Sequence, residues 1–392
     1  MHSDAGIEIH SGSARYKFLD LYRGIFVLLM LEGHIVRELL APGTLRPELY
    51  QLHELFHGIT GPGFFFGAGF TFAISSLRRW DVVTRFSAGF ARRAGRALML
   101  ILIGYALHLP YLSLRKLLAE ATPAQWNEFL SFSVLQAIGT TLALLYLALL
   151  VVRRERLFVG FLLLVLPVMV YLTPAVEYWS THEAVPPGLR AALTTETGSP
   201  YPILPFAGFV VAGVLAAWGF LQFGQRGREH RFMIALGAVG LLAIAFAWTA
   251  ERTILPSSSE DLYWKAGTNF FWMRLGILLV FLSFLWFVEE HMKTALFPGW
   301  LTILGVESFF VYIVHLPILY GWVLNPDLSL SSLWGQSLHL APALAITAAV
   351  TLAMVGGATL WRRLKKQHPV TVRAFLVWAS LSLVYAFLAN PF

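Results

Sequence analysis

The sequence contains no cysteine among its 392 residues. This absence excludes disulfide bonds, thiolate metal sites and a cysteine nucleophile. A covalent intermediate on this chain would have to form on serine, threonine or histidine.

Charge is also scarce. Charged residues make up 13% of the chain and hydrophobic residues 57%, and the mean hydropathy is +0.66. A soluble globular protein carries roughly 25% charged residues, so this chain cannot cover a water-facing surface and lipid must be its solvent. Apolar segments recur from one end to the other. We therefore predict one membrane domain over 19–392, after a cytoplasmic N-terminal segment at 1–18.

About eleven segments approach the roughly 20 apolar residues that a helix needs to cross a bilayer. The sequence therefore predicts an all-α, multi-pass membrane bundle of about eleven helices. The first is expected to be a retained span, because residues 1–17 lack the basic and apolar regions of a cleavable signal peptide. The predicted spans are 19–41, 60–77, 95–114, 129–152, 157–176, 201–223, 232–250, 266–288, 299–322, 339–361 and 374–390.

Basic residues fall in alternate loops. They crowd the connections at 78–96, 153–156, 226–231, 293 and 362–373, and the intervening connections hold few. Positive loops stay in the cytoplasm, so we predict the N-terminus inside and Phe392 outside. The same rule explains the net charge of +7 without nucleic acid as a partner.

The first span carries several ionisable residues. Arg23 and His34 are eleven residues apart, which places them within about 20° on one helix face and about 16 Å apart along the axis. Charged groups within spans are costly and normally face a protein interior or a water-filled cavity. Two interpretations stay open for each residue. Arg23 is a ligand or an anchor paired with Asp20 one turn earlier, and His34 is functional or only satisfies a neighbour.

Four segments resemble the acyltransferase-3 family of membrane proteins. Arg23 to His34 matches its Arg-x10-His motif, and Gly61–Phe70 is similar to its aromatic-rich segment that ends in a small-Gly-Phe step. Phe90–Arg96 looks like its paired-arginine stretch, and Leu304–Pro317 resembles its late Gly-x-x-Ser…Tyr-x-x-His segment.

The middle of the chain resembles the heparan-α-glucosaminide N-acetyltransferases and their bacterial relatives. The similar segments are Ser133–Gly139, Tyr201–Gly208 and the stretch from His57 to Pro62. Both families belong to one transmembrane acyltransferase superfamily. The human-type enzyme has asparagine where His34 falls and its catalytic histidine in the loop that follows, where this chain offers His53 and His57.

The resemblance implies transfer of an acyl group, expected to be acetyl, from cytosolic acyl-CoA to an acceptor outside. The expected location is the inner (cytoplasmic) membrane of a bacterium. A glycan, an amino-sugar or a glycolipid is the expected acceptor. Histidine suits removal of the acceptor proton, because its unperturbed pKa is near 6.5. We predict His34 as the base, with His57 second and Glu32 as an orienting or acidifying neighbour. Direct transfer and an acyl-histidine intermediate both fit these residues, and a homodimer stays open.

The phosphates of CoA need a cationic cradle on the cytosolic side. Arg92, Arg93 and Arg96 are candidates, because arginine recognises phosphate through paired hydrogen bonds. Topology alone also demands basic residues there, so ordinary loop charge is the competing interpretation. Arg23 is expected to reach the same donor from the membrane side.

Two further spans hold charges. Arg274 and Glu307 are predicted to face the protein interior and to pair with each other or with Glu32, because an unpaired charge in the membrane is very costly. Donor contact is a second role for Arg274. His315 is either a supporting residue of the site or a structural histidine.

Two other function classes stay open. His53-Glu54-Leu-Phe-His57 matches H-E-x-x-H, so an intramembrane zinc metalloprotease is an alternative, but it needs a third ligand and no convincing motif supplies one. We therefore expect no metal. A transporter also fits many spans with interior charges, although matching broken helices are not evident in the sequence.

Overall fold

The computed structural model describes residues 16–182, 184–254, 267–292 and 298–390. Most of the predicted N-terminal segment and of the connection 251–265 lies outside these ranges. Within them the regular elements are helices, which confirms the predicted all-α class. Helices suit a membrane because each satisfies its own backbone polar groups without water.

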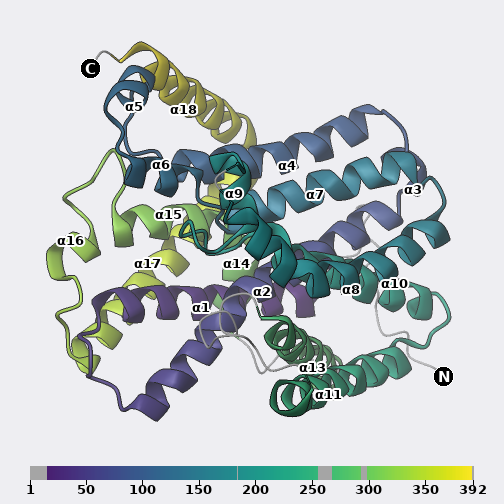
Figure 1. Ribbon diagram of the computed structural model, residues 1–392. Helices are drawn as coiled ribbons and strands as arrows, with labels where there is room; N and C mark the ends of the chain where they lie inside the picture. Colours follow the sequence, from purple (N-terminus) through teal and green to yellow (C-terminus); the bar gives the residue numbers. More distant parts are fainter. Residues whose placement is uncertain (1–15, 183, 255–266, 293–297, 391–392) are drawn as a thin grey trace.

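The helices differ widely in length, and Figure 1 colours them by their order in the chain. They are α1 (Lys17–Leu39), α2 (Pro47–Leu77), α3 (Trp80–Val83), α4 (Ala88–Leu107), α5 (Leu114–Glu120), α6 (Pro123–Leu130), α7 (Val134–Val151), α8 (Glu155–Ser180), α9 (Pro187–Leu193), α10 (Ile203–Gly224), α11 (Glu229–Thr253), α13 (Thr268–Met292), α14 (Gly299–Val306), α15 (Ser308–Tyr320), α16 (Leu330–Trp334), α17 (Leu340–Gln367) and α18 (Pro369–Ala389).

Each predicted span overlaps a helix, the ninth the bent pair α14 and α15, although the bounds differ by several residues at many ends. In the described part of the chain, however, only seven helices are long and apolar enough to count as spans, or eight with the bent pair. α1 and α4 contain too many charged residues to count as spans, and glycine and serine lower the mean hydropathy of α2. A multi-pass membrane protein is therefore supported, but the number eleven is not confirmed.

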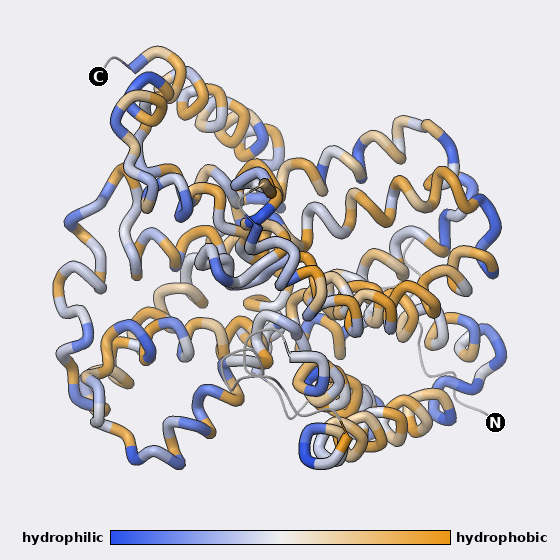
Figure 2. Tube along the Cα trace, viewed as in Figure 1, coloured by the Kyte–Doolittle hydropathy of each residue, from blue (hydrophilic) through white to orange (hydrophobic). Residues whose placement is uncertain are grey.

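The core lies where α10 crosses α2. Of the apolar window in α10, 78% is buried inside the protein. A Cβ atom on Gly69 of α2 would lie 1.9 Å from the carbonyl oxygen of Val210, so only glycine permits this close crossing. Buried phenylalanines surround it, among them Phe66, Phe70 and Phe209. Figure 2 shows hydrophilic residues gathered at the loops and helix ends, away from these apolar helices.

The two sides of the bundle differ in charge. We call the side that holds the starts of α1 and α4 and the end of α2 the basic side; there Arg78 donates a hydrogen bond to the Tyr16 hydroxyl. On the opposite side Asn390, directly after α18, donates to the Leu112 carbonyl at 2.8 Å. The start of α1 and the end of α18 therefore lie on opposite sides of the bundle. Which side faces the cytoplasm stays a prediction.

A sharp bend between α14 and α15 positions the site. The two helices meet at 82°. α14 crosses α1 so closely that a Cβ atom on Gly305 would lie 1.8 Å from the carbonyl oxygen of Asp20. α15 then runs beside α1 toward the opposite side (Figure 1). Side chains of α1, α2 and α15 are thereby brought together along most of α1.

Candidate active site

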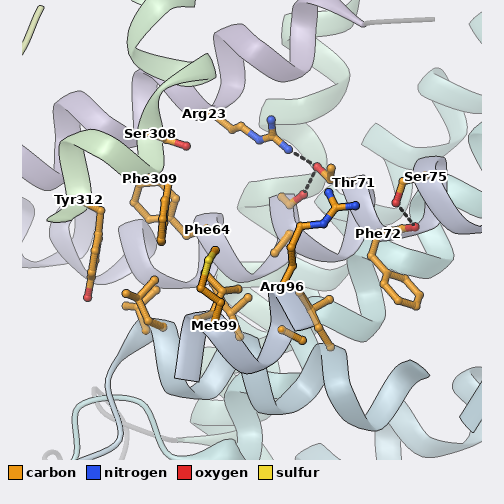
Figure 3. Close-up of a pocket in the computed structure, with 18 of the residues that line it drawn as sticks. Arg23, Phe64, Thr71, Phe72, Ser75, Arg96, Met99, Ser308, Phe309 and Tyr312 are labelled. Carbon is orange, nitrogen blue, oxygen red and sulfur yellow. Dashed lines mark hydrogen bonds between the residues drawn. The ribbon is translucent and has the colours of Figure 1, made fainter. Parts of the chain in front are cut away.

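The basic half of α1 lines a cavity of about 400 Å³. Arg23 donates a hydrogen bond to Thr71 Oγ1 of α2 and lies 4.0 Å from the Asp20 carboxylate, the contact that its interpretation as a paired anchor expects. Arg93 and Arg96 of α4 line the same cavity. Figure 3 shows the guanidinium groups of Arg23 and Arg96 close to Thr71. Three arginines from two helices thus share one cavity.

The remaining cavity wall is mostly apolar and comes from α1, α2, α4, α7 and α15. The Tyr22 hydroxyl donates to the Gly63 carbonyl at 3.0 Å and so holds α1 against α2. Arg92 is exposed and does not line the cavity, so the predicted arginine group is brought together only in part. The principal apolar and aromatic lining residues are Tyr22, Phe26, Phe64, Val134, Ile138 and Tyr312.

The other half of α1 faces a cluster of imidazoles. His34 is half-buried, and its Nδ1 lies 3.0 Å from Nε2 of His315 on α15. The His57 ring of α2 lies 5.6 Å from the His34 ring between centroids, and the His53 ring is parallel to that of His57 at 6.3 Å. We call His34, His53, His57 and His315 the histidine cluster. Both predicted candidate bases lie in it.

A glycine opens the space for His57. A Cβ atom on Gly33 would lie 2.1 Å from Nδ1 of His57, so any larger residue on this face of α1 would displace the imidazole. His57 Nδ1 is buried there, and no hydrogen-bond partner for it occurs among the described residues. Close packing against Gly33 thus positions the His57 ring, whereas a hydrogen bond to His315 positions the His34 ring.

Charged residues surround the cluster where α2 begins. His53 Nε2 lies 3.2 Å from Glu32 and its Nδ1 lies 3.7 Å from Glu54, and Arg37 lies 3.8 Å from Glu54. His53 stands in the first turns of α2, before the apolar stretch that begins at Ile59. The neighbouring carboxylates of Glu32 and Glu54 raise the pKa of His53 to about 9. Glu32 therefore contacts His53, and among the described residues no hydrogen bond or ion pair joins Glu32 to His34.

The cavity and the cluster are separate but adjacent. Phe26 is the last residue of α1 that lines the cavity, and His34 follows eight residues later, about 12 Å along the axis. On α15 the Tyr312 ring lines the cavity, and its centroid lies 5.8 Å from that of His315. Tyr312 thus connects the cavity wall to the histidine cluster.

The predicted interior position of two charged residues is confirmed, but the predicted pairing is wrong. Arg274 and Glu307 are 6% and 4% exposed. Glu307 binds Lys365 and Glu32 contacts His53, and among the described residues no ion pair joins either carboxylate to Arg274. The Arg274 guanidinium lies 3.8 Å from the centre of the Phe270 ring and beside Gly58. Arg274 therefore lies near the histidine cluster and does not line the arginine cavity.

The H-E-x-x-H motif has other partners here. Its first histidine and its glutamate contact each other, and they also contact Glu32 and Arg37 respectively. Within the described ranges, no group of three potential ligands has the geometry to hold a metal ion.

Sequence reasoning missed part of the cavity wall. Thr71 was not singled out, although Gly63, Gly67 and Thr71 recur every fourth residue on α2 and therefore share one face. Small and polar residues at this spacing in an apolar helix are the signal that predicts a cavity or a close helix contact.

The fold and this geometry define a class: a multi-pass membrane protein with a cationic cavity toward one side and an imidazole cluster toward the other. The family model described as heparan-α-glucosaminide N-acetyltransferase, catalytic, matches residues 15–251. The chain belongs to this family, which makes it a membrane acetyltransferase and favours neither the metalloprotease nor the transporter. A search among curated proteins gives no match. The family region contains α1 to α10 and all but the last two residues of α11, hence the cavity arginines and three of the four clustered histidines.

Proposed function

We propose that this protein transfers an acetyl group from cytosolic acetyl-CoA to an amino-sugar of a glycan or glycolipid on the other side of the inner membrane. The observation that carries the proposal is the placement of the arginine cavity and the histidine cluster along one helix, α1. A donor held on one side and an acceptor reached from the other would meet along this helix.

The arginine cavity is the proposed donor site. A volume of about 400 Å³ falls within the range of small-molecule pockets. Arg23, Arg93 and Arg96 would hold the phosphates, because charge-assisted hydrogen bonds to phosphate are strong. The apolar wall would take the pantetheine arm, whose thioester would extend past Tyr312 toward the cluster. Dependence on acetyl-CoA is general in the family.

The histidine cluster is the proposed site of chemistry. Acyl transfer needs a base that takes the acceptor proton. His34 is the proposed base, because it is half-buried and fixed by a hydrogen bond, and His57 is the second candidate. The acceptor nitrogen would form a bond to the acetyl carbon while the carbon–sulfur bond breaks. The proton would pass through His34 to the CoA thiolate.

Radiolabelled acetyl-CoA, incubated with the purified protein and glucosamine in lipid nanodiscs, tests the proposal. We expect CoA release and acetyl transfer in the wild type, weaker donor binding in Arg23→Met, and lost turnover with retained donor binding in His34→Ala. Retained turnover in His34→Ala with loss in His57→Ala would assign the base to His57. Absence of any CoA thioester binding to the wild type would refute the function.

A further inference from the structure

The hydrogen bonds of His315 have a definite direction. His315 Nδ1 lies 2.9 Å from the carbonyl oxygen of Val311, one turn earlier in α15. A carbonyl oxygen can only accept, so His315 Nδ1 must carry the proton. Because His315 is 1% exposed, and burial penalises the charged form, its ring is neutral and its Nε2 is an acceptor.

The direction of that bond fixes the next one. His315 Nε2 lies 3.0 Å from His34 Nδ1. Since Nε2 of His315 accepts, Nδ1 of His34 must donate. A neutral imidazole carries one N–H, so His34 Nε2 then holds a free lone pair. One backbone carbonyl thus sets the proton position on two rings in succession.

We propose that His315 is the positioning residue of this site. It holds His34 with the proton on Nδ1 and leaves Nε2 as the atom that takes the acceptor proton. This inference rests on the proposed function and names the reacting atom within it. A partner that selects the tautomer and the orientation of an imidazole has the same effect in metal sites and in catalytic triads.

His34 and His57 differ in whether a neighbour fixes their tautomer. The two rings lie 5.6 Å apart between centroids, so an acceptor near one is near the other. His57 Nδ1 is buried against Gly33 without a hydrogen-bond partner in the described chain, so no neighbour selects its tautomer. His34 is therefore the ring whose free nitrogen is defined before the acceptor binds.

The proton balance is simple. His34 Nε2 takes one proton from the acceptor amine as the carbon–nitrogen bond forms and the carbon–sulfur bond breaks. His34 is then doubly protonated, and its Nδ1–H still donates to His315. The proton on Nε2 passes to the CoA thiolate, which restores the neutral ring. His315 remains neutral throughout and neither gains nor loses a proton.

Three variants test the inference. His315→Leu removes the acceptor, and His315→Gln places an amide oxygen near the position of Nε2. His108→Leu is the matched control, because His108 Nδ1 also bonds a carbonyl one turn earlier, that of Gly104 at 2.8 Å, but takes no part in the cluster. The measurements are kcat and the KM for acetyl-CoA, thermal unfolding, and ¹⁵N NMR of histidine-labelled protein. The His34 signals are those missing in His34→Gln.

We expect the Nδ1–H form of His34 in the wild type, its loss in His315→Leu, and its retention in His315→Gln and His108→Leu. We expect kcat to fall at least about tenfold in His315→Leu with little change in KM, and to recover in part in His315→Gln. An unchanged His34 tautomer in His315→Leu would overturn the inference, whatever the activity. A changed tautomer with unchanged kcat would instead refute His34 as the base of the proposed function.

Discussion

The Glu307 carboxylate lies 2.5 Å from Nζ of Lys365, at the 82° bend between α14 and α15. The Glu307 side chain is 4% exposed and that of Lys365 is 41% exposed. The pair therefore ties the bend to the last turns of α17. Ser308, the next residue, lines the arginine cavity, so the pair also holds one wall of the proposed donor site.

Removal of Lys365 alone should destabilise the protein. Loss of one partner of a buried pair costs about 3–5 kcal/mol, and we expect Lys365→Met to cost less than this because solvent reaches the lysine. The measurement is thermal unfolding in detergent. Glu307→Gln combined with Lys365→Met should recover part of the loss, because no buried charge then remains. A single variant as stable as the wild type would contradict the assigned pair.

The three arginines in the basic segment of α4 should differ in effect. Arg93→Met and Arg96→Met each remove a cation from the cavity, and hydrogen bonds to charged groups contribute about 1.5–3 kcal/mol. We therefore expect the KM for acetyl-CoA to rise roughly 10- to 100-fold in each. Arg92→Met is the control, because Arg92 lies on the same helix but outside the cavity lining. Equal effects of all three would indicate general loop charge and no specific cradle.

Which arginines of α4 face the cavity could not be predicted from the sequence. The helical period places Arg96 on the same face as both Arg92 and Arg93, which are four and three residues away respectively. Which pair faces the cavity depends on the rotation of α4 against α2 and α7, which local periodicity does not determine. By contrast, Arg23 and His34 could be placed on one face of α1 because both lie in one helix.

Contacts between distant helices could not be predicted. The apolar segments of the sequence predicted nearly every long helix, because a helix that crosses a bilayer must be both long and apolar. Lys365, the partner of Glu307, lies 58 residues further along the chain, in the basic segment 362–373. The preference of basic residues for cytoplasmic loops already accounted for the lysines of this segment, so the sequence indicated no buried pair. The hydrogen bond between His34 and His315 likewise depends on the bend that starts α15, and no residue of α1 encodes that bend.

Substitution of Gly33 should affect catalysis more than folding. The Cβ atom in Gly33→Ala would lie 2.1 Å from His57 Nδ1, so the imidazole must move. We expect a stability loss of about 1–3 kcal/mol and a fall in turnover, since His57 borders His34. Gly160→Ala in α8 is the control. Apart from the adjoining residues and backbone of α8 itself, no described atom lies within 4 Å of its new methyl group, and alanine should stabilise the helix by about 0.5–1 kcal/mol. Unchanged turnover in Gly33→Ala would show that the placement of His57 is immaterial.

The contact between His53 and Glu32 should make stability depend on pH. The pKa of His53 is raised from 6.5 to about 9 by Glu32 and Glu54. A raised pKa means that the folded state holds the proton more tightly, so the stabilisation is complete below pH 6.5 and is lost as the pH rises through about 9. His53→Gln removes this titration. We therefore expect the Tm advantage of the wild type over His53→Gln to be largest near pH 6 and to disappear by about pH 10. The measurement is thermal unfolding of both proteins across this range in one buffer system. A constant difference between the two Tm values would show that the carboxylates do not hold the proton on His53.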